Sequence, residues 1–183
     1  MKYQEILVYE NIQFLKQGID LLQTINDEVY RNNNHEYFSS GAGKHFRHIL
    51  DHYSSFLSGS KGKIDYDTRK RDPRLESDRL YAIQKARDVI NGLNEKFGIA
   101  ASESNYIDVN SNEGDSCDAI SPWCQSTIVR ELQYLISHTV HHYALIAMIL
   151  RIQGCEPPAT FGVAPSTLKY QAALVQEGEH EPH

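Results

Sequence analysis

The sequence predicts an all-α protein built as a four-helix bundle. Four long segments place apolar residues three and four positions apart, which is the period of an amphipathic helix, and the stretches between them are polar. The length of 183 residues is enough for one domain with a hydrophobic core. We therefore expect a single domain over residues 1–175, followed by a flexible tail over residues 176–183.

The first two helices have clear ends. The first is expected from Tyr3 to about Val29, and the three consecutive asparagines 32–34 mark its end because their side chains compete for backbone hydrogen bonds. The second is expected from about Lys44 to Leu57, where a cluster of serine and glycine stops it. Both carry a continuous apolar arc, so both are expected to face the core.

The connector Lys61–Asp72 is charged, has no hydrophobic period and is expected to be a loop. The basic run Arg69–Arg71 within it is usual for a solvated loop, and the alternative is an anion-binding role near the mouth of a site. A third helix follows, capped by Asp72 before Pro73 or alternatively by Ser77, and it closes at Gly98.

The segment before the last helix, residues 101–124, is rich in serine, asparagine and aspartate. Tyr106–Val109 alternates in the manner of a short strand, which indicates a small hairpin. The fourth helix follows a cap at Ser126 or Thr127 and ends at Gly154. The residues after it are expected to be irregular, and disordered beyond about Ala173.

Composition excludes several classes of protein. The net charge of -6 and the pI near 5.8 argue against a general nucleic-acid binder, which needs a basic face. The most apolar run, Tyr143–Leu150, is too short to span a membrane, and the acidic N-terminal segment does not resemble a signal peptide. The cysteines are odd in number and are not spaced as close pairs, so a reducing, cytoplasmic setting is expected; they are Cys117, Cys124 and Cys155.

Histidines are the candidate functional residues of the fourth helix. His138 and His142 lie one turn apart within its apolar arc, whereas His141 projects to the polar side. A buried imidazole needs a partner for its ring nitrogens, and two at this spacing suit a shared divalent cation. The alternative is that both are structural histidines hydrogen-bonded inside the core.

The second helix offers a further ligand, because His45, His48 and His52 follow one border of its apolar arc. Helical projection places His45 and His52 nearer the arc than His48, and it does not choose among them. Carboxylate-rich metal motifs are missing, since the one Glu-x-x-His match, Glu177 to His180, lies in the tail. Phosphate loops and Cys-x-x-Cys pairs are missing as well, which leaves a site made of histidines.

Two short motifs, RHILDHY at Arg47–Tyr53 and SHTVHH at Ser137–His142, resemble the paired signatures of the DinB/YfiT-like superfamily of metal-dependent proteins. The resemblance assigns His48, His138 and His142 as the metal ligands. It covers the chain from the first helix to about residue 154.

Two further features of the helix-two motif bear on that assignment. Asp51 matches the acidic residue of the family motif. His45 and His52 depart from the family pattern as additional imidazoles, so they stay open as extra ligands.

The resemblance also implies an up-down-down-up bundle, often dimeric, with a divalent ion such as zinc, nickel or iron. Three neutral imidazoles leave the ion an open position that favours an anionic ligand. The implied function is a metal-dependent transferase of low-molecular-weight thiols, or a hydrolase, acting on a small electrophile. Glu131 is the candidate outer carboxylate or general base, and the alternative is an acid favoured by the helix dipole in the first turn.

Two rival functions stay open. One is a non-enzymatic metal-binding or interaction protein whose site is closed by His45 or His52, and the other is a metal-free bundle with structural histidines. The C-terminal half of the fourth helix is apolar nearly all round, because Ala147 and Met148 lie away from its main arc. A helix of this kind is covered on more than one side, either by a central position in the bundle or by a second subunit, and a homodimer is expected.

Overall fold

The computed structural model describes residues 3–33, 36–59, 62–97, 106–110 and 123–178. Its long helices are α1 (Tyr3–Thr24), α3 (Ala42–Ser58), α5 (Arg79–Phe97) and α6 (Ile128–Ile152). The other elements are α2 (Asp27–Arg31), β1 (Lys63–Asp65), α4 (Arg74–Ser77), β2 (Tyr106–Asn110), β3 (Cys124–Thr127) and α7 (Pro165–Gly178). The prediction of a mostly helical fold is confirmed.

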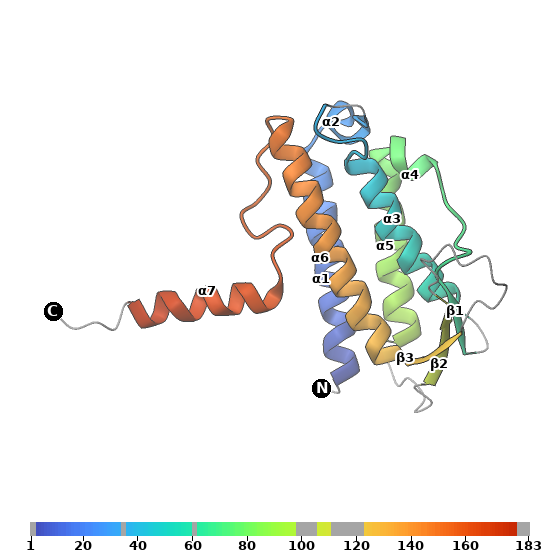
Figure 1. Ribbon diagram of the computed structural model, residues 1–183. Coiled ribbons are helices and arrows are strands. Elements are labelled where there is room, and N and C mark those ends of the chain that lie inside the picture. The colour runs from blue at the N-terminus through green and yellow to red at the C-terminus, as the bar shows by residue number, and fades with distance from the viewer. Residues whose placement is uncertain (1–2, 34–35, 60–61, 98–105, 111–122, 179–183) are drawn as a thin grey trace.

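The four long helices surround one core. α1 packs against α5 and α6, and α3 packs against the same two helices from the other side. In Figure 1, α1 and α6 run upward while α3 and α5 run downward, which gives the order up, down, down, up. The two helices that carry the histidine motifs, α3 and α6, are therefore direct neighbours.

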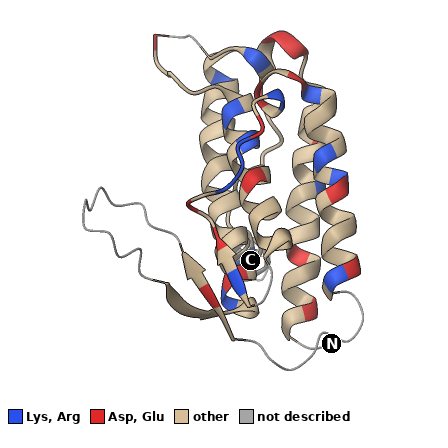
Figure 2. Ribbon diagram, turned by 90° about the vertical axis from the view of Figure 1, so that its right-hand side faces the viewer, with Lys and Arg blue, Asp and Glu red and all other residues tan. Residues whose placement is uncertain are grey.

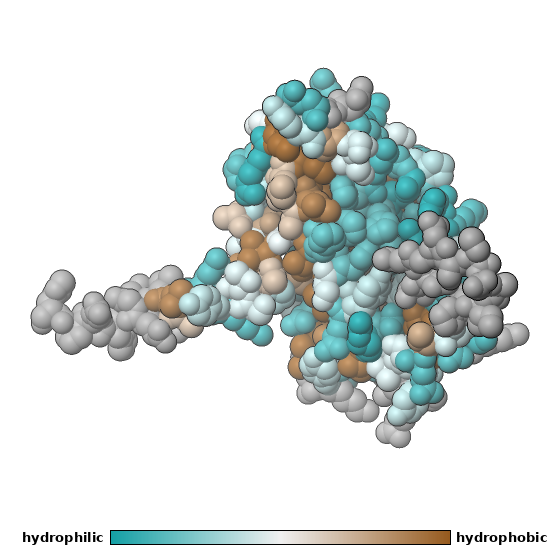
Figure 3. All heavy atoms as spheres, viewed as in Figure 1, coloured by the Kyte–Doolittle hydropathy of each residue, from teal (hydrophilic) through white to brown (hydrophobic). Residues whose placement is uncertain are grey.

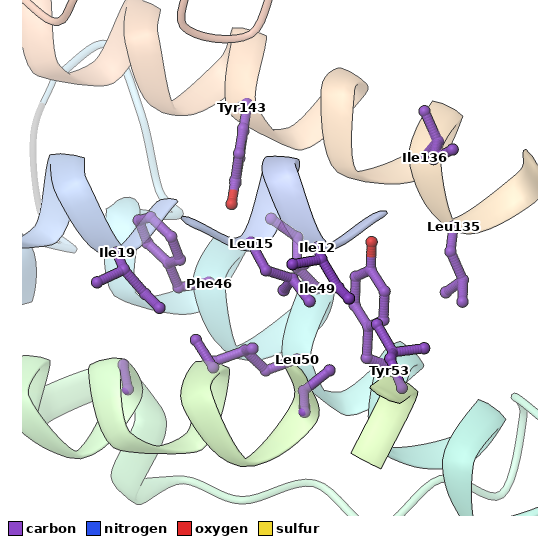
Figure 4. Packing of buried hydrophobic residues seen from close by; sticks show 14 of the residues in the cluster. Ile12, Leu15, Ile19, Phe46, Ile49, Leu50, Tyr53, Leu135, Ile136 and Tyr143 are labelled. Carbon is purple, nitrogen blue, oxygen red and sulfur yellow. The ribbon is translucent and has the colours of Figure 1, made fainter. Parts of the chain in front are cut away.

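Apolar side chains from three helices meet between them. Figure 4 shows Leu15 of α1, Phe46 and Ile49 of α3, and Leu135 and Tyr143 of α6 pointing toward one another. All five are buried, as the helical spacing of apolar residues predicts. Burial of this kind supplies most of the free energy that holds helices together.

A buried polar network sets how the helices face each other. Asn11 donates through Nδ2 to the carbonyl oxygens of Leu7, at 2.8 Å, and Leu132, at 3.1 Å. Its Oδ1 accepts from the Tyr53 hydroxyl at 2.7 Å, and that hydroxyl lies 3.3 Å from the Thr139 hydroxyl. Since a buried polar group without a partner costs about 1–3 kcal/mol, this network favours one rotation of α3 and α6 about their axes.

The first helix is shorter than predicted. α1 ends at Thr24, and the side chain of Asn26 accepts a hydrogen bond from the Val29 backbone N–H at 2.9 Å. Asn26 therefore caps the separate short helix α2, because an asparagine side chain satisfies an N–H group that a new helix leaves free. The predicted continuation to Val29 is wrong at this break.

The third helix begins in two steps. Asp72 Oδ1 accepts from the Arg74 backbone N–H at 3.1 Å at the start of α4. Asp78 Oδ1 accepts from the Tyr81 backbone N–H at 2.9 Å at the start of α5. Ser77, predicted as an alternative cap, is instead the last residue of α4. Gly98, predicted to close the helix, lies outside the described residues.

The predicted short strand is present and belongs to a small sheet. β2 pairs antiparallel with β3, as expected of a hairpin. β1 pairs parallel with β2, with Ile64 opposite Val109, so the expectation of a loop over Lys61–Asp72 is wrong for these three residues. A three-residue strand with a single buried side chain, Ile64, is too short to show a period of two.

The end of the chain also departs from the prediction. Gly154 takes a left-handed conformation, with φ of 78°, and closes α6 where the sequence indicates. Residues 155–164 are irregular as expected, but Pro165–Gly178, expected to be irregular and then disordered, form α7, which projects away from the bundle in Figure 1. Pro165 suits a first helical position, and the leucine, lysine, glutamine and alanine that follow are good helix formers.

α6 has the length and composition of a membrane span. It has 25 residues, and its most apolar window has a mean hydropathy of 1.2, which the short run Tyr143–Leu150 did not reveal. Core helices of bundles meet the same criterion, and α6 packs against α1 and α3. The expectation of no membrane association stays a prediction.

Candidate metal centre

Three histidines from two helices converge. His48 comes from α3, while His138 and His142 come from α6, and one ring nitrogen of each lies within 4.8 Å of those of the other two. His138 Nε2 lies 3.0 Å from His48 Nε2. The ring centroid of His142 is 4.5 Å from that of His48 and 4.6 Å from that of His138. The packing of α3 against α6 thus brings the residues of the two sequence motifs together.

The geometry is compatible with a shared divalent ion. An ion bound at about 2.1 Å to two imidazoles separates their nitrogens by roughly 3.0–3.4 Å when the angle between the bonds is about 90–110°. The 3.0 Å between the Nε2 atoms of His48 and His138 meets that requirement. A cation between these two atoms would satisfy both lone pairs, and His142 would approach it from one turn further along α6.

Burial keeps these imidazoles uncharged. Loss of water, followed by the neighbouring histidines, lowers the pKa of His48 and of His142 to about 3. The same causes lower the pKa of His138 to about 2. Metal ligation requires a neutral imidazole with a free lone pair, so the three side chains are in the ligating form at neutral pH.

The two additional histidines of α3 lie beside this group. His45 Nδ1 is 2.9 Å from His142 Nδ1. His52 Nδ1 donates to the His48 backbone carbonyl at 2.7 Å, and its ring centroid is 4.2 Å from that of His138. Among the described residues the converging group contains neither of them. The exposed His141 lies outside that group as well.

Glu131 occupies a separate, buried position in the first turn of α6. Its Oε1 accepts from the Ser126 hydroxyl at 2.6 Å. Its carboxylate also lies near Tyr66. Burial first, and then the negative charge of Glu131, raise the pKa of the Tyr66 phenol. Among the described residues, the converging group of histidines does not include Glu131.

Two tyrosines that the sequence did not single out enclose the histidines. The ring of Tyr66 stacks on His52 with centroids 5.5 Å apart, and the ring of Tyr134 stacks on His138 at the same distance. Tyr134 precedes His138 by one helical turn, so helical spacing was a usable signal for it. Tyr66 lies in the connector after β1, where the sequence has no period to reveal it.

An arginine of the connector reaches the site. Arg69 Nη2 lies 3.4 Å from His48 Nδ1, and Arg69 Nη1 donates to the Tyr66 carbonyl oxygen at 2.7 Å. The connector between β1 and α4 runs up the side of the bundle that faces the viewer in Figure 2, where its basic residues are blue. The sequence allows two interpretations of the basic run: a solvated loop, or residues near the mouth of a site. The position of Arg69 fits the second interpretation.

Asp51 holds this connector against α3. It is buried, forms an ion pair with Arg47 at 3.8 Å and accepts a hydrogen bond from the Asp72 backbone. Burial raises the pKa of Asp51 to about 6 despite these partners. Arg47 also forms an ion pair with Glu76 of α4. The acidic residue of the motif thus anchors the segment that carries Arg69 and is not in the converging histidine group.

Comparison with known proteins agrees with the motifs. FK506-binding protein 5 of Rhizopus delemar is 33% identical over 107 residues, which is 58% of this chain. The matched region spans only 27% of that fungal protein. The model of the DinB family matches residues 3–173, nearly the whole chain. The chain belongs to the DinB family.

Proposed function

We propose that this protein binds one divalent metal ion through His48, His138 and His142 and uses it on a small molecule. The observation that carries the proposal is the convergence of three uncharged imidazoles from two helices. Imidazole nitrogen suits zinc, nickel and iron, and these are the ions we propose. Three protein ligands leave at least one position for a further ligand, as in catalytic metal sites.

In the proposed reaction the sulfur of a low-molecular-weight thiol, having lost its proton, forms a bond to a small electrophile and displaces its leaving group; in the hydrolytic alternative water takes the place of the thiol. When bound, the ion would supply Lewis acidity that activates a thiol or water as a nucleophile. The chain supplies the enclosure: the rings of Tyr66 and Tyr134 cover His52 and His138 and limit the access of water. Glu131 touches Ser126 and lies near Tyr66, so we propose it as a positioning residue for this wall.

Elemental analysis of protein purified without a histidine tag tests the metal site. We expect one ion per chain in the wild type and in His141→Ala, whose side chain is exposed. We expect His142→Ala to lose the ion during gel filtration in a weak chelator, because two imidazoles remain. Full occupancy in His142→Ala would contradict the ligand assignment. Absence of any stoichiometric ion, with unchanged folding in chelator, would favour a metal-free bundle.

A second experiment separates an enzyme from a binding protein. The metal-loaded protein is mixed with a panel of small thiols and 1-chloro-2,4-dinitrobenzene, and separately with activated esters. We expect a rate above background that disappears in chelator and returns when the ion is restored. A metal-loaded protein that accelerates neither reaction would favour the alternative, a non-enzymatic metal-binding or interaction protein.

We also propose that two copies pair through the apolar surface of α6. Met148 is 59% exposed and Ile152 is 40% exposed, although Ala147, the other residue expected there, is buried within the chain. Figure 3 shows hydrophobic residues gathered over α6 and the segment after it, beside a hydrophilic band. Light scattering tests this: we expect a dimer for the wild type and a monomer for Met148→Glu. A monomeric wild type would reject the pairing.

A further inference from the structure

A basic cavity lies beside the histidines. It has a volume of about 410 Å³ and is bounded by the end of α3, by β1 and by the connector that follows β1. Its charged lining residues are Lys63, Arg69 and Lys70, with Asp65 as the single acid. The Asp65 carboxylate already accepts hydrogen bonds from the backbone of Asp67 and Thr68, both at 3.0 Å. The cavity therefore has an excess of positive charge.

Arg69 joins the cavity to the candidate metal centre. It lines the cavity, and its Nη2 is 3.4 Å from His48 Nδ1. In the described part of the chain no carboxylate lies within 4.0 Å of its guanidinium, a feature that it shares with Arg71, Arg87 and Arg130, whereas the other five arginines have such a partner. Its buried Nε has no hydrogen-bond partner among these residues. An arginine held in this way is a receptor for an oxyanion.

The positive charge of the metal-loaded site also favours a negatively charged ligand. Three neutral imidazoles do not reduce the charge of a divalent ion, and the unpaired guanidinium of Arg69 adds to it. Among the described residues, the two acids near Arg69 have nearer partners: Asp51 pairs with Arg47 and the Asp72 backbone and interacts with the Arg69 charge only as a smaller contribution, and Asp65 accepts from its own turn. A ligand that brings a negative charge is therefore favoured over a neutral one of the same shape.

We propose that Arg69, with the basic cavity, binds the carboxylate of the small thiol or electrophile that the histidine site takes. The inference rests on the proposed function, because the other end of that molecule lies at the ion. Arg69 Nη2 is at most roughly 8 Å from an ion on His48 Nε2, the sum of the 3.4 Å contact, the imidazole ring and one ligand bond. Two or three carbons between sulfur and carboxylate span this gap.

The connector makes Arg69 a prepared receptor. Its Nη1 is held by the Tyr66 carbonyl, and the connector is fixed to α3 through Asp51. A side chain held in place before binding loses little rotamer freedom when the ligand arrives, so more of the electrostatic gain contributes to affinity. Recognition by Arg69 would therefore select the class of substrate, while the histidines act on any thiol.

The test uses the full chain loaded with cobalt(II), whose absorption changes when sulfur binds. It is titrated with 3-mercaptopropionate and with 3-mercapto-1-propanol, which differ only in the carboxylate. We expect the acid to bind at least about tenfold more tightly to the wild type, as for a charge-assisted hydrogen bond. In Arg69→Gln we expect this preference to fall to near equality, with the affinity for the alcohol unchanged.

Two variants make the result specific. Arg71→Gln removes a neighbouring, exposed charge of the same run, and we expect it to keep the preference. Arg69→Lys keeps the charge without the planar fork, and we expect an intermediate preference. Thermal unfolding of each variant checks that it folds, and if Arg69→Gln is unfolded the Arg69→Lys result decides.

The outcomes are distinguishable. Equal affinity of the wild type for acid and alcohol would overturn the inference while leaving the metal site intact. A preference that survives in Arg69→Gln would also overturn it, because the carboxylate would then bind the ion or another group. Failure of cobalt to bind, or of either thiol to change its absorption, would overturn the proposed function and this inference together.

Discussion

His138 Nε2 lies 3.0 Å from His48 Nε2, although 90 positions of the sequence separate the two residues. This contact exists only because α3 packs against α6, and the Asn11 network helps to set that packing. An ion held between the two helices would bind the folded chain and not the unfolded one. Folding stability and metal binding are therefore expected to be linked.

Metal removal should lower thermal stability. At a free ion concentration about 100-fold above the Kd, binding adds about 2.7 kcal/mol to the free energy of unfolding. For a chain of this size that corresponds to a rise in Tm of roughly 5–11 °C. Differential scanning calorimetry with and without chelator measures the rise. We expect it in the wild type and His141→Ala, and a rise that persists in His48→Ala would contradict the linkage.

His45→Ala should lower the metal affinity without abolishing metal binding. His45 contacts His142 at Nδ1, so it orients a ligand and is not one of the three converging residues. Loss of such an outer partner typically costs about 10–100-fold in metal affinity. Competition with a chromophoric chelator measures the Kd. A loss as large as that in His142→Ala would make His45 a fourth ligand, and an unchanged Kd would remove it from the site.

Glu131→Gln should leave metal affinity within about threefold of the wild type. The carboxylate contacts Ser126 and lies near Tyr66, and it is not in the described histidine group. Glutamine keeps the size and one acceptor oxygen, so the main cost is a weaker hydrogen bond, about 0.5–1.5 kcal/mol of stability. The same chelator competition decides the matter. A loss of affinity above tenfold would instead make Glu131 a direct partner of a ligand histidine.

The metal-free protein should lose stability steeply below pH 6.5. Burial lowers the pKa of His48 and His142 to about 3 and that of His52 to about 4 in the folded state, against 6.5 unfolded. Between these values the unfolded chain binds protons that the folded chain does not. Each such histidine therefore lowers the free energy of unfolding by up to about 1.4 kcal/mol per pH unit as the pH falls through this range. Above pH 7 it adds no pH dependence, because it is neutral in both states.

Asp51 opposes this trend. Its folded pKa is raised from 3.8 to about 6, so its protonation favours the folded state between those values. One carboxyl does not offset several histidines, and the net slope is expected to stay destabilising. Urea midpoints of the metal-free protein at pH 7.5, 6 and 5 measure it. His142→Ala should show a shallower slope, and equal midpoints at pH 7.5 and 5 would contradict the expectation.

Much of the fold and the core of the site follow from local sequence. Four long helices leave a clear 3.6-residue period, and the two histidines of α6 lie on one face by spacing alone. Helical projection placed His48 further from the core than His45 and His52, yet His48 is the α3 histidine that belongs to the converging group, with its Nε2 3.0 Å from His138 Nε2. Projection measures the angle to the residues of the same helix, whereas the meeting point depends on where the neighbouring helix lies.

The remaining parts of the site come from residues without local periodicity. Tyr66 and Arg69 lie in a connector whose position is determined by Asp51 and by the pairing of β1 with β2. Both interactions join residues distant in sequence, so no window of sequence contains them. α7 was missed for another reason: its residues favour a helix locally, but their weak amphipathic pattern resembles that of an irregular segment.

Gly18→Ala should disturb the site from a distance. A Cβ at Gly18 of α1 would collide with the hydroxyl of Tyr143, the residue after His142. That hydroxyl donates to the Phe14 carbonyl at 2.9 Å, and the ring stacks on Phe161 with centroids 4.4 Å apart, so Tyr143 has little room to move. We expect a loss of about 1–3 kcal/mol in stability and weaker metal binding, because α6 must shift.

Gly92→Ala is the matched control for this substitution. The new Cβ would meet only the tip of the flexible Leu57 side chain, 2.9 Å away, and a helical alanine gains up to about 1 kcal/mol over glycine. We therefore expect Gly92→Ala to be near neutral in both Tm and metal affinity. If Gly18→Ala were equally neutral in both measurements, α1 and Tyr143 would not constrain the position of His142, and the histidine group would depend on the contact of α3 with α6 alone.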